Sequence, residues 1–316
     1  MRATIAVEPP SPKLMAELAP FLGSVLEAAR FDDPTFVNAL YLDAPRAPLL
    51  AQARIDGRVV GHQALLWMQM RTSSGTTLAA SLSVNSAAAR EIRGSGVYPD
   101  LVLTLAGAAV DAGTLCYYGV TNEGSMKATT RLGGKVVAQL PIHVLDSAAR
   151  PQRGWRHRPV TQELLDGDVP ERVAEDADRR SRFGVRTGWN AELLRWRLSI
   201  PGTPMTLHEH PRFWVLTAVR KVRGIPVVVL AKVWAREEPE VPERFPASAV
   251  AAIARHHRTP AVIHVGLNAD VRFLGVPVPR RFRPAPLYLT YFANPGVVAT
   301  QEVDFDCFEP LDFDAL

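Results

Sequence analysis

The sequence contains very little cysteine, and this excludes two classes of protein. Cys116 and Cys307 are the only cysteines among 316 residues. Two are too few for a disulfide framework or for a metal site built from thiolates. Hydrophobic residues nevertheless make up 47% of the chain and charged residues 22%. A disordered regulator is therefore excluded as well, because the chain has ample material for a buried core.

Long hydrophobic runs are also missing. No apolar stretch approaches the roughly 20 residues that a membrane-spanning helix needs. The first residues, Met1-Arg-Ala-Thr-Ile, lack the basic-then-apolar layout of a signal peptide. We therefore expect a soluble, cytoplasmic protein with no membrane partner.

Lysine is scarce, which changes how the charge should be interpreted. The formal charge is +4, but only five of the 36 basic residues are lysines. The high pKa of arginine raises the calculated pI of 9.3. Acidic residues nearly balance basic ones in both halves, so the composition predicts a mildly cationic globular protein rather than a nucleic-acid binder.

The first half alternates between strand and helix patterns. Apolar residues between Pro12 and Ala29 recur every three or four positions, which is typical of a helix. Asp33 is expected to cap a second helix that runs to Tyr41. Strands are expected at 4–7, 49–55, 59–70, 77–84, 115–120 and 135–145, and further helices at 99–112 and 124–132. Residues 1–146 therefore predict a domain of mixed α/β class.

The second half repeats this order less clearly. Residues 147–159 are rich in arginine and proline and are interpreted as a linker. A hairpin turning at Arg223-Gly224 is followed by a helix at 247–256 and strands at 261–265 and 287–292. Residues 160–316 thus predict a second domain that is a degenerate copy of the first.

A glycine loop is the most informative segment. The strand ending Ser83-Val84 leads to Arg93-Gly94-Ser95-Gly96-Val97-Tyr98 and then to a long helix. Glycines allow the backbone to approach a ligand, and the free amides of a first helical turn attract phosphate. The spacing lacks both the Gly-Lys-Ser/Thr ending of a P-loop and the full dinucleotide pattern.

This segment resembles motif A of the GNAT acyltransferase superfamily, Arg/Gln-x-x-Gly-x-Gly/Ala, with Tyr98 in place of the last small residue. The resemblance continues downstream, where Asn122, Ser125 and Gly133 fit the family pattern. Thr129 and Gly134 replace its usual tyrosine and phenylalanine. The fold that it implies is GNAT-like, with a second, degenerate GNAT-like domain as in FemAB-like two-domain members.

The resemblance also implies a set of residues around acyl-CoA, which would be a co-substrate. Amides at a bulge near Leu82, Ser83 and Val84 would face the thioester carbonyl. The loop Arg93, Gly94, Ser95, Gly96, Val97 and Tyr98 would hold the pyrophosphate, and Asn122 and Ser125 would line the far side of the cleft. Asn122 has an alternative role as an ordinary helix cap.

The sequence offers several positions for the catalytic acid. Thr129 occupies the usual tyrosine position, and its hydroxyl is too short and too weakly acidic for a simple replacement. Tyr117 and Tyr118 lie on the neighbouring strand, where alternation sends them to opposite faces. We select Tyr118 and Asn122 as catalytic candidates, while packing remains an alternative for Tyr118.

Other polar residues are candidates for the acceptor site. His62 follows a glycine in a hairpin strand, and Asp304 and Asp306 are spaced to share a face where they could bind an amine. A structural histidine and a solvated terminus are the alternatives. His208 and His210 could ligate a metal, but no third ligand is evident, so no metal is expected.

The leading hypothesis is an acyl-CoA-dependent N-acyltransferase, most simply an acetyltransferase, acting on a small-molecule amine such as an amino sugar, an amino acid or a secondary metabolite. One alternative is a peptide ligase that uses aminoacyl-tRNA, which the cluster Arg280-Arg281-Phe282-Arg283 could contact. Another is a binding module that keeps the fold without the chemistry. Neither the acceptor nor the oligomeric state follows from the sequence.

Overall fold

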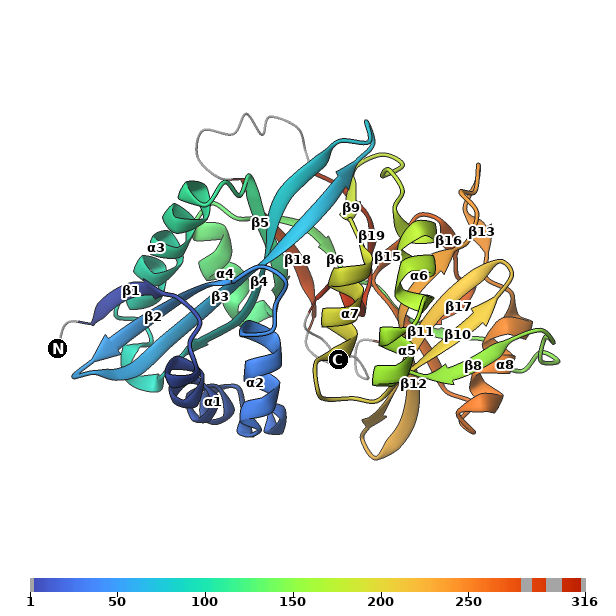
Figure 1. Cartoon of the computed structure of the whole chain (residues 1–316), viewed down its shortest axis with the longest axis horizontal. Helices are drawn as coiled ribbons and strands as arrows, with labels where there is room; N and C mark the ends of the chain where they lie inside the picture. Colours follow the sequence, from blue (N-terminus) through green and yellow to red (C-terminus); the bar gives the residue numbers. More distant parts are fainter. Residues whose placement is uncertain (1–2, 280–285, 294–302, 314–316) are drawn as a thin grey trace.

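The computed structural model describes residues 3–279, 286–293 and 303–313. They form two lobes side by side, each built on a twisted sheet (Figure 1). Residues 303–313, which we call the C-terminal segment, run between the lobes.

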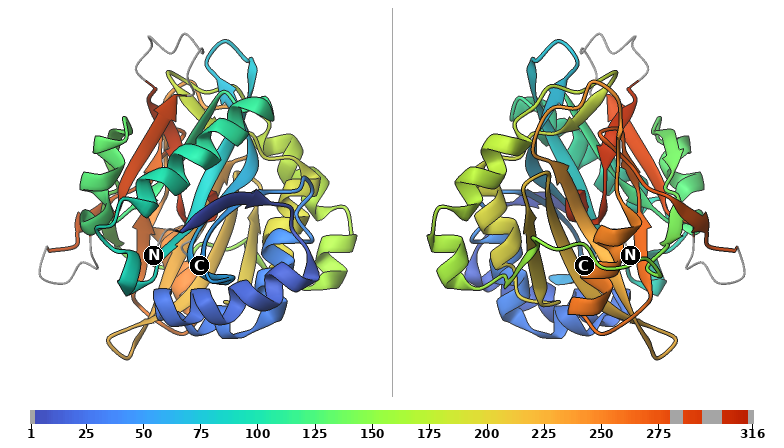
Figure 2. Two further views of the ribbon diagram at one scale, coloured as in Figure 1. Left: turned by 90° about the vertical axis from the view of Figure 1, so that its left-hand side faces the viewer. Right: turned by 90° about the vertical axis from the view of Figure 1, so that its right-hand side faces the viewer.

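The first lobe has seven strands in the order β6-β18-β5-β4-β3-β2-β1. Its strands are β1 (Thr4–Glu8), β2 (Leu49–Ile55), β3 (Arg58–Thr72), β4 (Thr77–Ala88), β5 (Cys116–Thr121), β6 (Lys135–Gln139) and β18 (Tyr288–Ala293). Its helices are α1 (Pro12–Leu26), α2 (Pro34–Tyr41), α3 (Val97–Asp111) and α4 (Glu123–Arg131). α1 and α3 cover opposite faces of the sheet and bury separate apolar clusters (Figure 2).

The second lobe repeats this plan in the order β17-β7-β14-β12-β11-β10-β8. Its strands are β7 (Ile142–Leu145), β8 (Arg156–Pro159), β10 (Met205–His210), β11 (Phe213–Val222), β12 (Ile225–Ala235), β14 (Val262–Val265) and β17 (Gly275–Pro277). Its helices are α5 (Gln162–Asp166), α6 (Val169–Ala177), α7 (Ala191–Ser199) and α8 (Ala247–His256). In both lobes one parallel pair, β4-β5 or β12-β14, lies among antiparallel neighbours.

The two repeats exchange their last strands. β7 follows β6 in the chain but pairs with β14 and β17 of the second lobe. In return, β18 follows β17 and is inserted between β5 and β6 of the first lobe. Each sheet is therefore completed by the other repeat.

Several short elements complete the fold. The first sheet is extended from the end of β3 by β9 (Val185–Thr187), β19 (Phe305–Phe308) and β15 (Leu267–Asn268). β13 (Glu243–Arg244) pairs with β16 (Val271–Arg272). Single turns of 3-10 helix occur at η1 (Ala29–Asp32), η2 (Arg90–Ile92) and η4 (Pro310–Asp312).

Some expected elements differ from the structure. The single strand expected at 135–145 is divided into β6 and β7, because Pro141 has no N–H to donate and the chain there crosses to the other lobe. The expected linker 147–159 includes the edge strand β8, which pairs with β10. The strand expected at 77–84 extends to Ala88.

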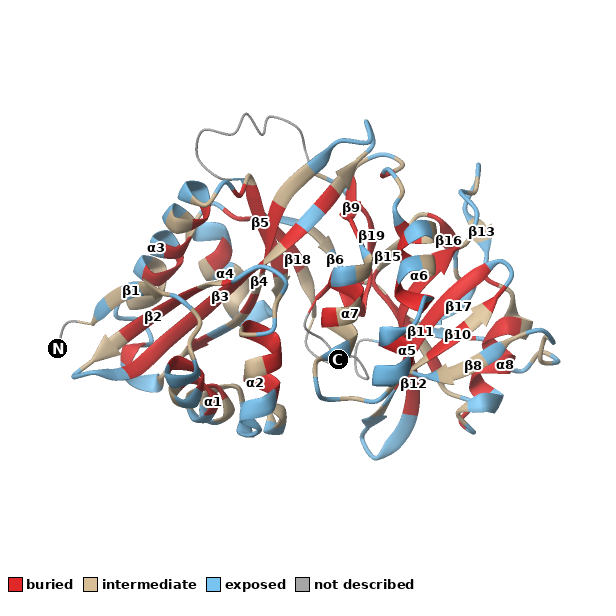
Figure 3. Ribbon diagram, viewed as in Figure 1, coloured by how far each residue is buried: buried red, intermediate tan, exposed pale blue. Residues whose placement is uncertain are grey.

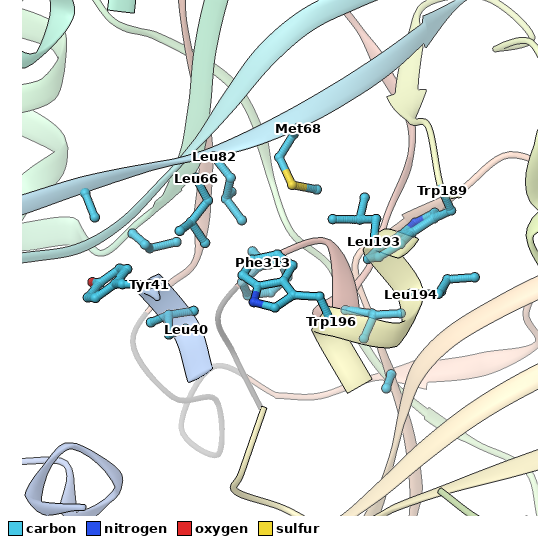
Figure 4. Packing of buried hydrophobic residues seen from close by; sticks show 14 of the residues in the cluster. Leu40, Tyr41, Leu66, Met68, Leu82, Trp189, Leu193, Leu194, Trp196 and Phe313 are labelled. Carbon is cyan, nitrogen blue, oxygen red and sulfur yellow. The ribbon is translucent and has the colours of Figure 1, made fainter. Parts of the chain in front are cut away.

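A shared core joins the lobes. Buried residues follow the central strands of both lobes (Figure 3). One apolar cluster runs from α1 and α2 to α6 and α7. Phe313 lies between Tyr41 and Trp196 in this cluster (Figure 4). The indole of Trp196 donates to the carbonyl of Ala39 across the interface, at 2.8 Å.

Buried charges fix the C-terminal segment in the second lobe. The ammonium of Lys232 on β12 lies 2.5 Å from Asp312 and 3.4 Å from Glu309. Glu309 also accepts the amide of Val233 and the side chain of Asn268. The C-terminal segment therefore lies beside the end of β12. The corresponding position in the first lobe is the end of β4, beyond its pairing with β5.

Candidate functional site

The strands β4 and β5 separate at the centre of the first lobe. Their parallel pairing runs from Ala80–Cys116 to Ser83–Gly119 and stops there. A Cβ on Gly119 would lie 2.8 Å from the carbonyl oxygen of Ser83, so glycine permits this close approach. Beyond this pair the strands diverge, as the family resemblance implied.

A β-bulge lies where the strands diverge. Asn85 and Ser86 on β4 stand opposite the single residue Gln63 on β3. Asn85 has the left-handed φ of 54°. A bulge interrupts the ladder and leaves backbone groups available to a ligand. The expected positions were Leu82 to Val84, so the bulge follows them directly.

A cavity of about 540 Å³ opens at this point and passes between β4 and β5. Its wall comes from α1, η1, β3, β4, α3, β5, α4, β18 and the C-terminal segment. The lining side chains are mostly apolar or uncharged polar, and Arg30 is the one charged residue among those that the structure describes.

The glycine loop leads to the cavity. Gly94 and Gly96 have φ values of 80° and 85°, a region that glycine adopts without strain. Gly96 is the N-cap of α3, whose first amides have no partner within the helix. Tyr98 lines the cavity and hydrogen-bonds Ser86 at the bulge, while its burial raises the pKa of its phenol.

The opposite wall is the start of α4. The carboxamide oxygen of Asn122 accepts the amide of Ser125 at 3.0 Å, so Asn122 is a helix cap. Both residues also line the cavity, together with the buried Thr129. Capping and lining are therefore compatible at Asn122.

Not every expected cofactor residue reaches the cavity. Ser83 and Val84 line it, whereas the side chain of Leu82 packs into the core beside Leu66 (Figure 4). Arg93 and Ser95 are exposed on the loop that precedes Tyr98, where Arg93 donates to the carbonyl of Ala88.

Tyr118 does not reach the cavity. It is fully buried on the other face of β5 against Phe305 and Phe308, where burial raises the pKa of its phenol. Tyr117 lines the cavity instead and stacks on Phe292, with ring centroids 4.4 Å apart. We therefore assign Tyr118 to packing.

His62 lies behind the cavity wall. It is fully buried, and this burial lowers the pKa of its imidazole to about 3. Its Nε2 is 3.3 Å from the hydroxyl of Tyr41, which accepts the side-chain amide of Asn85 at 2.8 Å. His62 therefore cannot touch an acceptor directly.

The two aspartates also lie elsewhere. Asp306 is buried and pairs with Arg186 at 3.1 Å and with Ser181 at 2.8 Å, so its charge is already neutralised. Asp304 is exposed, and its backbone carbonyl accepts the amide of Val185. Neither residue lines the cavity, and the expected amine site at this pair is wrong.

The two histidines of β10 have separate partners. His208 contacts His157 and His257, whereas His210 contacts Gln152 and Trp155, so the pair does not share a ligand. In the part of the chain that the structure describes, no group of three or more His, Cys, Asp or Glu residues is arranged around a metal position. No helix of this part has the length and apolarity of a membrane span. The cluster 280–283 lies outside the described residues.

Sequence reasoning missed Asn85, Arg30 and Phe313 as cavity residues. Asn in a strand next to a motif A loop is a signal for a bulge, because Asn tolerates the left-handed region better than most residues. Nothing in the local pattern places Arg30 or Phe313, since both reach the cavity through the packing of distant segments.

No protein-family model matches the chain, and no curated protein matches it. Solved structures do resemble it. A conserved Enterococcus faecalis protein of unknown function is 12% identical, with a TM-score of 0.63 over 92% of this chain and 73% of the other. A GCN5-related N-acetyltransferase from Anabaena variabilis is 12% identical, with a TM-score of 0.62 over 91% and 72%. N-myristoyltransferase of Saccharomyces cerevisiae, solved with myristoyl-CoA, is 10% identical, with a TM-score of 0.59 over 93% and 80%. At this identity the likeness establishes the fold, which is that of GNAT acyltransferases.

Proposed function

We propose that the protein is an N-acyltransferase that moves the acyl group of an acyl-CoA, in the simplest case acetyl-CoA, to a small-molecule amine. The observation that carries the proposal is the bulged opening between β4 and β5, which joins the cavity to the N-terminus of α3. Acyl-CoA carries a thioester at one end and a pyrophosphate at the other. An opening between two strands, next to helix amides that have no partner within the helix, fits both groups.

Each part of acyl-CoA has a place in this arrangement. Pantetheine would lie between β4 and β5, with the pyrophosphate at the loop 93–98. Backbone N–H groups at the bulge would stabilise the oxyanion that forms when the amine attacks the thioester carbon. The C–S bond then breaks, the amine nitrogen loses a proton, and the leaving thiolate takes one. Tyr98 and Tyr117 are the phenols on the described cavity wall that can supply it.

The second lobe has a different role in this proposal. The position equivalent to the acyl-CoA cleft is occupied by Glu309, which accepts the amide of Val233. One acyl-CoA per chain is therefore expected, and the second lobe contributes Phe313 to the cavity instead.

Calorimetric titration with acetyl-CoA tests the proposal, with free CoA and an adenine dinucleotide as comparisons. Saturable micromolar binding of the CoA species alone, at one site per chain, supports it and justifies a screen of amines. Absence of binding at millimolar concentration overturns it and favours transfer from aminoacyl-tRNA or a non-catalytic module. Formation of an acylated amine in that screen would support the transfer itself.

A further inference from the structure

One edge of β3 has a gap between β2 and β9. On this edge β2 pairs with β3 only as far as Leu65, and β9 pairs with it only from Met70. Between these limits the carbonyl of Gln69 accepts the amide of Gly188 at 2.7 Å. Within the described part of the chain, residues 66–68 therefore have no neighbouring strand on this edge, and the sheet has a gap of three residue positions in line with β2 and β9.

Trp67 turns its backbone toward this gap. In an antiparallel sheet the N–H and C=O of one residue point to the same side, and successive residues alternate between the two sides. Gln69 bonds toward β9, whereas Thr72 bonds to Thr76 in the β3–β4 turn on the other side. Trp67 lies two residues before Gln69, so both of its backbone groups point into the gap. Unpaired groups of this kind are a template for an added strand.

A cavity of about 360 Å³ lies at the gap, which is within the range of roughly 300–1,000 Å³ that is usual for small-ligand sites. Leu66 and Met68 of β3 lie across it from Leu193 and Trp196 of α7 (Figure 4). Among the described residues, none lines both this cavity and the one between β4 and β5. A ligand at the gap would therefore occupy a site of its own.

The two ends of the gap carry opposite charges. Arg46 precedes β2, and its guanidinium is held 3.4 Å from the ring centre of Trp67. Glu192 lies in the first turn of α7, shortly after Gly188. Both side chains are exposed and line the cavity, and no ion pair joins either of them to another described residue. A second hollow continues past Gly188, and its described wall has three acidic residues and one basic residue, Arg71. The β9 end is therefore acidic and the β2 end basic.

Strand direction agrees with this distribution of charge. β2 and β9 are both antiparallel to β3, and β9 ends at the gap whereas β2 begins after it. A segment in line with them would enter beside Gly188 and leave beside Leu49. Its amino end would then lie near Glu192 and its carboxyl end near Arg46, where a free ammonium and a free carboxylate each meet the opposite charge.

We propose that the gap is a binding site for a short extended peptide, three residues long, with both termini free. The central residue of the peptide exchanges both backbone hydrogen bonds with Trp67, while the ammonium pairs with Glu192 and the carboxylate with Arg46. The side chains of its first and third residues share the face of Leu66 and Met68, so small apolar side chains suit them. The chain itself occupies the next position at each end of the gap, which limits the length of the peptide. The inference goes beyond the proposed function and does not depend on it.

Titration of the 15N-labelled protein with trialanine, followed by NMR, tests the site without any variant. The backbone amide of Trp67 should shift in a saturable way, with a dissociation constant on the order of 1 mM or below. Dialanine should bind more weakly because it cannot reach both charges. Trialanine methylated on its central nitrogen should also bind more weakly, because it lacks the N–H that the carbonyl of Trp67 accepts. Absence of a saturable shift at millimolar trialanine, or equal binding of the three peptides, would overturn the inference.

Variants combined with blocked peptides test the direction. Glu192→Gln should weaken trialanine binding by about threefold, and the matched control Glu163→Gln, exposed at the same helix position of α5, should not. N-acetyl-trialanine should bind the wild-type protein and Glu192→Gln equally, because it has no ammonium to lose a partner. Trialanine amide should likewise bind the wild-type protein and Arg46→Gln equally.

The opposite pattern, in which the amide is insensitive to Glu192→Gln and the acetylated peptide to Arg46→Gln, would reverse the strand and overturn the inference. Failure of acetyl-CoA to bind would instead overturn the proposed function, and the calorimetric titration measures that separately.

Discussion

At the scale of single residues, backbone conformation is the strongest link between this sequence and its proposed activity. Gly94 and Gly96 adopt left-handed φ values, and no atom lies within 4 Å of the Cβ that either would gain. Space is therefore available at the loop, and the left-handed backbone by itself favours glycine at both positions. Both glycines were visible in the sequence, which is why the loop could be predicted.

The substitution Gly96→Asp should abolish acetyl-CoA binding, because a carboxylate at the N-cap of α3 would repel the pyrophosphate. The control is Gly75→Asp in the β3–β4 turn, where φ is 83° and the added side chain is equally unobstructed. Both variants carry a similar conformational cost of about 1–2 kcal/mol. Calorimetric titration should separate them, and equal affinity for acetyl-CoA in the two variants would contradict the placement of the pyrophosphate.

At the scale of elements, the sequence predicted what periodicity controls. β2 has the predicted bounds, and the order β4, loop, α3, β5 and α4 followed from alternating patterns. The functions of His62 and Asp306 could not be predicted in the same way. Their partners, Tyr41 and Arg186, are distant in the sequence, and burial rather than local pattern decides whether a polar side chain faces a ligand.

At the scale of elements, four histidines at the edge of the second lobe form a cluster that makes the stability of the protein depend on pH. His157 on β8, His208 on β10 and His256 and His257 at the end of α8 contact one another, with His157 and His208 joined by a 2.6 Å hydrogen bond. Burial, and for three of them repulsion from neighbouring imidazoles, lowers the pKa of all four, that of His257 to about 4.

Acidification should therefore destabilise the protein. The unfolded chain takes up protons near pH 6.5, whereas these folded imidazoles do not, so stability is complete above about pH 6.5 and falls as the pH drops toward 4. Each imidazole that stays neutral contributes up to about 1.4 kcal/mol per pH unit in that window. Thermal unfolding between pH 8 and pH 5 should show the decline. His257→Gln should reduce its slope, and the exposed Arg255→Gln should not; an unchanged slope in His257→Gln would remove this residue from the effect.

Buried ion pairs join η4 to β12, and their contribution to stability can be measured. Removing one member of a buried pair typically costs about 3–5 kcal/mol, because the remaining charge loses its partner. Lys232→Met should lower the free energy of unfolding by this amount, since Asp312 and Glu309 would both remain buried. The exposed Lys221→Met should change it by less than about 0.5 kcal/mol.

The same variant should also affect ligand binding, because η4 precedes Phe313 in the cavity wall. We expect weaker acetyl-CoA binding in Lys232→Met at a temperature where the variant is still folded. Unchanged affinity would mean that Phe313 holds its place without the ion pairs.

At the scale of the whole molecule, the repeated order of elements could be predicted and the strand exchange could not. A repeated order of elements is visible in one dimension, but a strand pattern does not specify which sheet the strand will join. β7 and β18 are apolar strands that would fit either lobe by composition. Pro141, which separates β6 from β7, is the local signal that the chain leaves the first sheet there.

The exchange implies that the first lobe cannot complete its sheet alone. A fragment of residues 1–146 would lack β18, and β5 and β6 would be left as unpaired edges. The structure suggests a repaired fragment, because the amide of Leu140 donates to the carbonyl of Leu287 where β6 and β18 meet. Residues 1–140, a two-residue Asn-Gly turn and residues 287–293 would place β18 in a hairpin with β6.

We expect the fragment 1–146 to show no cooperative thermal transition and the repaired fragment to show one, since the repair restores the ladder on both sides of β18. Circular dichroism during heating measures the difference. Co-expression of 1–146 with 147–316 should give a complex that unfolds cooperatively, because the two pieces exchange β7 and β18 as the intact chain does. A cooperative transition in the fragment 1–146 alone would contradict this expectation, because it would show that the first lobe folds without the exchanged strand β18.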